Sequence, residues 1–143
     1  FESVTDSIQF PIFLEILDKA MKKGDRFSLL SVKMANMDIC NRQMGLEFTN
    51  ELIRKVFKVI KNCVGGRAFI SRKGGGHFYI ILKSNEAVDV RHMLKILTYT
   101  INKGITEERV SDIISNVTTG VSYFPEDTTN LWELIEIADK KKK

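Results

Sequence analysis

RKGGGHF, residues 72–78, is the stretch of this sequence that decides the fold. It joins two short apolar runs, Ala68–Arg72 and His77–Leu82, through three consecutive glycines. Glycine adopts the positive φ angles that a tight turn between antiparallel strands needs, because it has no Cβ atom. Turn geometry alone explains such a stretch, so by itself it predicts a β-hairpin and no particular chemistry.

The segments before and after the hairpin alternate between helix and strand patterns. Two further apolar runs predict strands at Phe27–Met34 and Ile113–Val121. Apolar residues spaced three and four apart predict amphipathic helices at Phe10–Met21, Glu47–Asn62, Val88–Ile101 and Leu131–Ala138. After the first helix the order is βαββαβ, followed by a terminal helix. We therefore predict the α/β class, an α+β sandwich with an antiparallel-type central sheet and surrounding helices, and this split order places helices on one face.

The composition fits one compact domain over residues 1–143, since 43% of the residues are hydrophobic and 28% are charged. The chain starts at Phe1 and ends in four lysines, so we expect it to be a segment of a larger multidomain protein. These four lysines carry the whole formal net charge of +4, because the remaining 18 basic residues balance 18 acidic residues. Without a basic stripe elsewhere, we expect no nucleic-acid partner.

The cysteines and the hydropathy pattern indicate the compartment. Cys40 and Cys63 lie far apart, without CxxC spacing or nearby histidines, which predicts reduced thiols and a cytoplasmic setting. The sequence has no run of about twenty apolar residues, so we expect no direct insertion into a membrane. Any membrane tether of the full protein would come from segments outside this sequence.

Several short motifs, in a consistent order, resemble one family. RKGGGHF is similar to the signature R-x-G-G-D/E-E-F of GGDEF domains, the family of diguanylate cyclases. Downstream, residues 117–122 resemble the family's strand T-x-S-x-G-V-A, FPED at 124–127 resembles its turn Y/F-P-x-D, and Ala138-Asp139 falls at its closing helix. The resemblance spans nearly the whole chain and implies a fold similar to nucleotide cyclase and polymerase palm domains.

The resemblance also implies a chemistry whose ligands this sequence lacks. Diguanylate cyclases join two GTP molecules across a dimer, and their carboxylates hold magnesium-type cations. One carboxylate pattern, D-x-D, ends the first strand, where this chain has Lys33 and Ala35. The other is the acidic pair of the hairpin, where this chain has Gly76 and His77. Both halves of the metal site are thus changed, so we predict no metal, no cofactor and no cyclase activity.

The nucleotide-reading positions of the family are less altered. Asp38 replaces a basic residue and would repel a triphosphate. Asn41 matches the family's guanine-reading Asn, and Asn50 stands where an Asp receives the guanine N–H groups. We prefer the simpler interpretation that both are exposed polar residues near a helix start. The inhibitory R-x-x-D pattern would fall at Gly65 and Ala68, so we predict no inhibitory site.

Two of the substituted residues leave alternatives open. His77 has the side chain of an acid, base or metal ligand near neutral pH, but the sequence offers it no Asp or Cys at ligand spacing, so we expect a structural role. The ammonium of Lys33 would hold phosphate in place of the lost metal, pair with a carboxylate, or extend into water.

Together these observations favour a catalytically inactive GGDEF-like domain with a regulatory, dimerisation or scaffolding role in bacterial cyclic-dinucleotide-type signalling. Its partner would be another protein, a second copy of the chain or a neighbouring domain. The alternative function is a metal-independent sensor of a GTP-like nucleotide, bound through Asn41, Asn50 and Lys33. An active cyclase with unusual ligands is the least favoured of the three.

Overall fold

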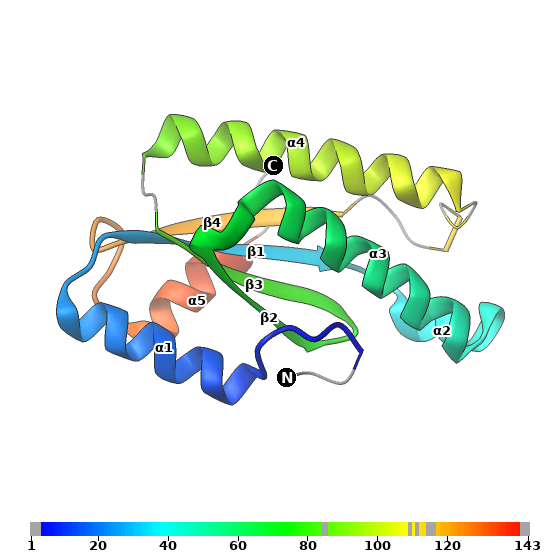
Figure 1. Cartoon of the computed structure of the whole chain (residues 1–143), viewed down its shortest axis with the longest axis horizontal. Coiled ribbons are helices and arrows are strands. Elements are labelled where there is room, and N and C mark those ends of the chain that lie inside the picture. Colours follow the sequence, from blue (N-terminus) through cyan, green and yellow to red (C-terminus); the bar gives the residue numbers. More distant parts are fainter. Residues whose placement is uncertain (1–3, 84–85, 109, 111, 114–116, 141–143) are drawn as a thin grey trace.

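The computed structural model of the chain describes residues 4–83, 86–108, 110, 112–113 and 117–140. The regular elements, in chain order, are α1 (Phe10–Lys23), β1 (Phe27–Met34), α2 (Met37–Met44), α3 (Leu46–Val64), a short 3₁₀ turn η1 (Gly65–Arg67), β2 (Ala68–Gly74), β3 (Gly76–Leu82), α4 (Ala87–Glu107), β4 (Thr118–Phe124) and α5 (Leu131–Asp139) (Figure 1). Lysines 141–143 of the terminal run lie outside the described residues. None of the described helices has the length and hydropathy needed to cross a bilayer.

The four strands form one sheet in the order β2-β3-β1-β4, and every neighbouring pair is antiparallel. β1 lies at the centre, where Leu30 is paired with Ile80 on one side and with Val121 on the other. This order confirms the predicted βαββαβ arrangement with an antiparallel sheet.

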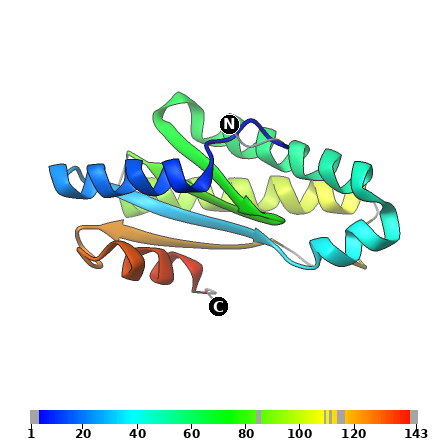
Figure 2. The ribbon, with the colours of Figure 1, turned by 90° about the horizontal axis from the view of Figure 1, so that it is seen from below.

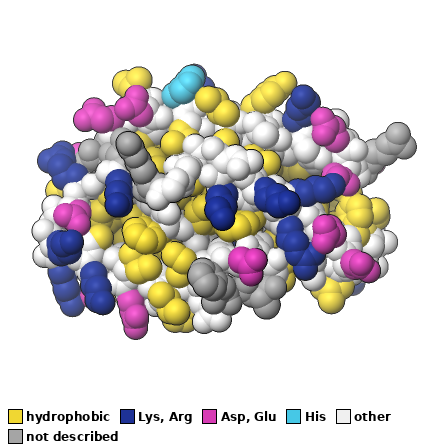
Figure 3. Space-filling model, in the orientation of Figure 1, with side chains coloured by type: hydrophobic (Ala, Val, Ile, Leu, Met, Phe, Trp, Pro, Cys, Tyr) yellow, Lys and Arg dark blue, Asp and Glu magenta, His cyan; other side chains and the backbone are white. Residues whose placement is uncertain are grey.

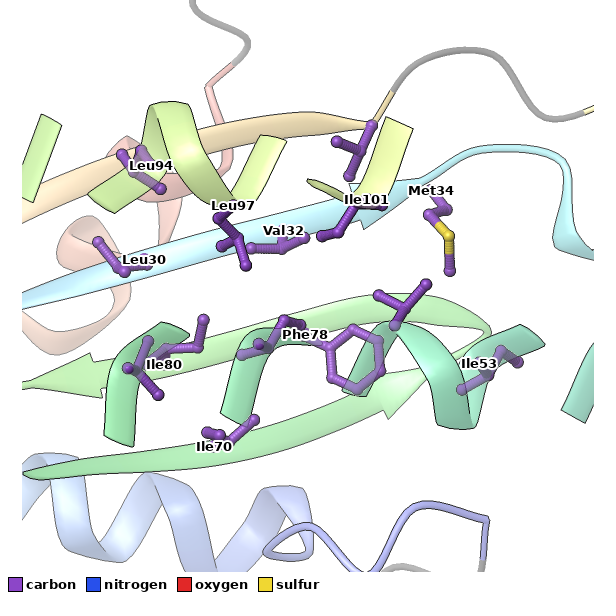
Figure 4. Packing of buried hydrophobic residues seen from close by; sticks show 14 of the residues in the cluster. Leu30, Val32, Met34, Ile53, Ile70, Phe78, Ile80, Leu94, Leu97 and Ile101 are labelled. Atoms are coloured by element: carbon purple, nitrogen blue, oxygen red, sulfur yellow. The ribbon is translucent and has the colours of Figure 1, made fainter. Parts of the chain in front are cut away.

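Helices cover both faces of the sheet, because side chains of β1 alternate between two buried clusters. Leu30, Val32 and Met34 pack against α3 and α4, as Figure 4 shows for Leu94, Leu97 and Ile101 of α4. The intervening residues Phe27 and Leu29 pack against α1 and α5 on the opposite face. In Figure 2, α1 and α5 lie on the near side of the sheet and α4 passes behind it. The prediction of helices on one face is therefore correct only for α3 and α4 of the βαββαβ unit.

One helix was not predicted, and the bounds of α4 and β4 differ most from the prediction. The sequence pattern did not reveal α2, because only Met37 and Cys40 of this short helix are buried. α4 continues past Gly104 to Glu107, and the burial of Ile105 gives this last part a packed face. β4 begins at Thr118, so the start of the predicted strand Ile113–Val121 is wrong, and residues 114–116 lie outside the described residues.

The C-terminal end of α5 lies unusually close to β4. A Cβ atom on Gly120 would sit 2.0 Å from the backbone oxygen of Ala138, so only glycine fits at this position of the strand. The start of α5 is fixed as well, because the side chain of Asn130 accepts a hydrogen bond from the backbone N–H of Glu133 at 3.0 Å. These two contacts hold Asp139, the last residue of α5, against the sheet.

Candidate functional site

The β1–β3 ladder brings together the two sequence positions at which carboxylates were expected and are absent. In this register Met34 lies opposite Gly76, and Lys33 lies opposite His77. The hairpin turn uses positive φ angles at Gly74 (151°) and Gly75 (51°). The guanidinium Nε of Arg72 donates a hydrogen bond to the Gly75 carbonyl at 2.8 Å, which closes the turn. Lys33, Gly76 and His77 therefore meet at one end of the sheet, as the resemblance implied.

Methionine side chains occupy the space around Gly76. A Cβ atom added to Gly76 would lie 2.9 Å from Cβ of Met34 and 3.0 Å from Cγ of Met37. A carboxylate-bearing residue at this position would thus have to displace apolar atoms. Ala35, the second expected carboxylate position, is exposed beyond the end of β1. Across the part of the chain that the structure describes, no three His, Cys, Asp or Glu side chains are grouped as metal ligands.

Two hollows border this end of the sheet. The first, which we call the hairpin hollow, has a volume of about 410 Å³ and lies between the end of β1, the start of α2 and the β2–β3 turn. Lys33, Lys73 and Asp38 supply its charged side chains. The second, which we call the α5 hollow, measures about 260 Å³ and is bounded by β1, β4 and the end of α5. Lys33, Lys73 and His77 line both hollows.

Asp139 is the centre of a hydrogen-bond network in the α5 hollow. Its Oδ2 accepts a hydrogen bond from the hydroxyl of the buried Tyr79 at 2.6 Å, and its Oδ1 accepts one from Oγ of Ser31 at 2.9 Å. Nε2 of His77 lies 3.2 Å from the same Oδ1 and 3.1 Å from Ser31 Oγ. The imidazole also packs on the Tyr79 ring, with 4.5 Å between the ring centroids. No pattern in the sequence indicated that Asp139 is the partner of His77.

The surroundings of this network shift two pKa values. Burial lowers the pKa of His77; the charge of Asp139 opposes this effect, and the nearby Lys33 and Lys73 add to it. Burial raises the pKa of Tyr79, and the hydrogen bond to Asp139 raises it further by holding the proton. Both side chains are thus held in their neutral forms near neutral pH.

The network contains Ser, His and Asp side chains but does not have the geometry of a nucleophilic triad. In a triad the histidine contacts the serine through one ring nitrogen and the carboxylate through the other. Here the single atom Nε2 of His77 faces both partners, and the hydroxyl of Ser31 donates a hydrogen bond to Asp139. The arrangement is suited to attaching the end of α5 to β1 and β3, which favours the structural role predicted for His77.

The two remnant nucleotide-reading residues line neither hollow. Asn41 is exposed on α2, and Asn50 is half-buried on α3. At the positions of the inhibitory pattern, Gly65 begins the 3₁₀ turn η1 and Ala68 begins β2, and neither carries a charged group. The structure therefore brings together Lys33, Gly76 and His77 but not Asn41 and Asn50 with them.

Comparison with known proteins agrees with this fold and hairpin. Residues 11–142 match the family model described as "Diguanylate cyclase, GGDEF domain". The chain belongs to the GGDEF family. None of the curated proteins matches the sequence.

Several solved structures are similar to this GGDEF domain. The GGDEF domain of PA1120 (TpbB or YfiN) from Pseudomonas aeruginosa superposes with a TM-score of 0.78 at 17% identity, over 96% of this chain and 83% of that one. The coiled coil and GGDEF domain of DgcB from Caulobacter crescentus, in complex with c-di-GMP, superposes with a TM-score of 0.75 at 20% identity, over 96% of this chain and 75% of that one. Diguanylate cyclase SiaD from Pseudomonas aeruginosa, in complex with its activator SiaC, superposes with a TM-score of 0.76 at 13% identity, over 96% of this chain and 54% of that one. At these identities the likeness shows the fold.

Proposed function

We propose that this GGDEF domain is catalytically inactive and acts as a regulatory domain in cyclic-di-GMP signalling. The observation that carries the proposal is the pairing of Lys33 and Met34 with His77 and Gly76 across the β1–β3 ladder. Magnesium-type cations require carboxylate or carbonyl oxygens at close range. The side chains at these paired positions instead supply an ammonium, an imidazole and a thioether.

The packing around Gly76 supports the same proposal. Met34 and Met37 fill the position from which an acidic side chain would extend, so recovery of a metal site would need repacking as well as a new carboxylate. If the domain keeps its buried clusters but lacks metal ligands, its function depends on the surfaces that the fold presents. Contact with another protein, a second copy or a neighbouring domain would then carry the signal. Diguanylate cyclase SiaD in complex with its activator SiaC is an example of contact with another protein.

An assay of GTP turnover tests the proposal. The purified domain is incubated with GTP and either Mg²⁺ or Mn²⁺, and the nucleotides are separated by chromatography, with an active diguanylate cyclase assayed in parallel. We expect GTP to remain intact in the presence of this domain. Synthesis of cyclic di-GMP that increases with the concentration of the domain would overturn the proposal and favour a cyclase with unusual ligands.

The hairpin hollow favours one second candidate, a metal-independent sensor of a GTP-like nucleotide. Lys33 and Lys73 both line this hollow of about 410 Å³, and an ammonium group binds phosphate without a metal ion. Asp38 on the same wall opposes an anion, and Asn41 and Asn50 do not line the hollow. Binding in this mode would thus rest on the phosphates and would discriminate poorly between bases.

Calorimetric titration of GTP and ATP, with and without Mg²⁺, separates the sensor from the regulatory domain. Metal-free binding that is lost in Lys33→Glu and kept in Lys58→Glu, a matched change of an exposed lysine on α3, would support the sensor. If wild-type protein binds neither nucleotide, the sensor is excluded and the regulatory proposal stands.

A further inference from the structure

The outer face of α4 combines apolar and charged side chains at a seven-residue spacing. Asp89 lies seven residues before Ile96 and Lys103 seven residues after it, so the three side chains lie close to one line along the helix. His92 and Tyr99 form a second line beside the first. The exposed fractions are 47% for Ile96 and 69% for Tyr99, which are high values for such large apolar side chains.

The opposite face of α4 already has its partners. Val90, Leu94, Leu97, Ile101 and Ile105 are buried in the cluster between α4, α3 and the sheet. The outer face is thus not needed for the core of this domain. Figure 3 shows hydrophobic side chains and a histidine along the edge of the molecule that α4 covers in Figure 1. Within the described residues, neither Asp89 nor Lys103 takes part in an ion pair.

This arrangement of charges is complementary to itself. If two copies of α4 pack antiparallel about a two-fold axis at Ile96, residues equally distant from Ile96 face each other. Asp89 of each copy then faces Lys103 of the other, and the two Ile96 side chains meet on the axis. A two-fold contact forms both ion pairs at once, whereas a shift by one helical turn breaks both of them.

The apolar side chains fit the same alignment. Tyr99 of the second copy falls level with Met93, between His92 and Ile96 along the helix axis. A hollow of about 270 Å³, lined by Cys63, Asp89, His92, Met93 and Ile96, lies at this level beside α4. The exposed aromatic ring therefore meets a recessed apolar surface, and aromatic side chains in such recesses contribute strongly to interfaces.

We propose that the outer face of α4 is a self-association surface, on which a second copy of this chain docks antiparallel through Ile96, Tyr99 and two Asp89–Lys103 ion pairs. The contact involves one helix from each copy, so it belongs to the small, weak class of interfaces, below about 1,200 Å² in total. The proposed α4 contact depends on the proposed function only for its biological role, because dimerisation is one way in which an inactive domain regulates a partner.

Charge reversal tests the contact directly. Asp89→Lys alone places two ammonium groups opposite each other at each end of the interface, and Lys103→Asp alone places two carboxylates there. Each single variant thus replaces both attractive pairs with repulsive ones. An equimolar mixture of the two variants restores attraction at both ends of a heterodimer, and the double variant restores two opposite-charge pairs in a homodimer. Lys19→Asp, the same charge change on the exposed face of α1, is the matched control.

The pairing in the mixture follows from the two-fold geometry. In a heterodimer the Asp89→Lys copy presents two ammonium groups, at positions 89 and 103, and the Lys103→Asp copy presents two carboxylates at the same positions. Position 89 of each copy faces position 103 of the other, so both ends of the heterodimer join an ammonium to a carboxylate. The mixture is therefore expected to associate where neither variant does so alone.

Sedimentation equilibrium between about 10 μM and 1 mM measures the masses, because small interfaces dissociate in this range. We expect concentration-dependent dimerisation of wild type and Lys19→Asp, a dissociation constant raised about tenfold or more in each single variant, and recovery in the mixture and the double variant. Recovery in the mixture also shows that both single variants are folded. A wild type that stays monomeric at 1 mM, or single variants that dimerise like wild type, would overturn the proposal.

The outcome of this test is independent of the turnover assay. A domain that makes no cyclic di-GMP and stays monomeric would keep the proposed function and lose the α4 surface. A domain that makes cyclic di-GMP and dimerises through α4 would lose the proposed function and keep the surface.

Discussion

The hydroxyl of Tyr79 donates a hydrogen bond of 2.6 Å to Oδ2 of Asp139, and this bond joins β3 to the last residue of α5. Tyr79 is fully buried, so its hydroxyl has no alternative partner in bulk water. Asp139 also accepts a hydrogen bond from Ser31 of β1, which makes its carboxylate the common acceptor for two strands. The carboxylate of Asp139 thus links the end of α5 to both β1 and β3.

Asp139→Ala is expected to lower the free energy of unfolding by about 2 kcal/mol, because it leaves the buried Tyr79 hydroxyl and Ser31 without their acceptor. Tyr79→Phe, which removes the donor but leaves Asp139 with Ser31, is expected to lower it by about 1 kcal/mol. Urea unfolding followed by circular dichroism measures both. Glu136→Ala, on the exposed side of α5, is the control and should be neutral. Equal stability of Asp139→Ala and Glu136→Ala would show that the network contributes nothing.

The buried imidazole of His77 predicts a loss of stability in mild acid. Its pKa in the folded protein is lowered from the ordinary value of 6.5, chiefly by burial, so the unfolded chain binds this proton more readily than the folded one. Stability due to neutral His77 is therefore complete above pH 6.5 and declines as the pH falls from there toward the folded pKa.

The urea midpoint measured between about pH 8 and pH 5 shows this decline, and His77→Gln should reduce it, because glutamine does not titrate. His92→Gln serves as the control, since His92 is exposed on α4. A wild-type midpoint that rises on acidification would indicate that the attraction of Asp139 outweighs burial at His77.

Alanine substitutions at Gly120 and Gly104 are expected to change the free energy of unfolding in opposite directions. Gly120→Ala places a Cβ atom 2.0 Å from the backbone oxygen of Ala138, so α5 must move, and we expect a loss of at least about 2 kcal/mol. Gly104 lies within α4 with no atom within 4 Å of its would-be Cβ, so Gly104→Ala should add about 0.5–1 kcal/mol. Thermal unfolding at low protein concentration compares the two. A Gly120→Ala variant as stable as wild type would contradict the close approach of α5.

Local patterns in the sequence were sufficient to predict most of the fold. The strand Phe27–Met34 was predicted at its observed bounds, because its continuous apolar run reflects burial on both faces of the sheet. The glycines at positions 74 and 75 predicted the hairpin turn, and both adopt the positive φ angles that the turn requires. Helix α2 was missed, since a helix of eight residues with two buried side chains has too short an apolar face to show a period.

The site was predictable only where the family motifs specify it. The motifs placed Lys33 and Gly76 at the same end of the sheet, and the β1–β3 register agrees with that placement. The pairing of His77 with Asp139 was not predictable, because these residues are 62 positions apart and meet only once α5 packs on β4 through Gly120. The filling of the Gly76 position by Met34 and Met37 likewise depends on packing that no local pattern reports.

The charges around His77 predict opposite changes of its pKa in two variants. Lys33 lowers the pKa of His77 and Asp139 raises it, so Lys33→Ala should raise that pKa and Asp139→Asn should lower it. Asp139→Asn keeps the size of the side chain, so its effect on the pKa reports mainly the loss of charge. Titration of the His77 ring protons by NMR measures each value, with Lys58→Ala as a control distant from the site. Shifts of the same sign in the two variants would mean that local rearrangement, rather than charge, sets the pKa of this histidine.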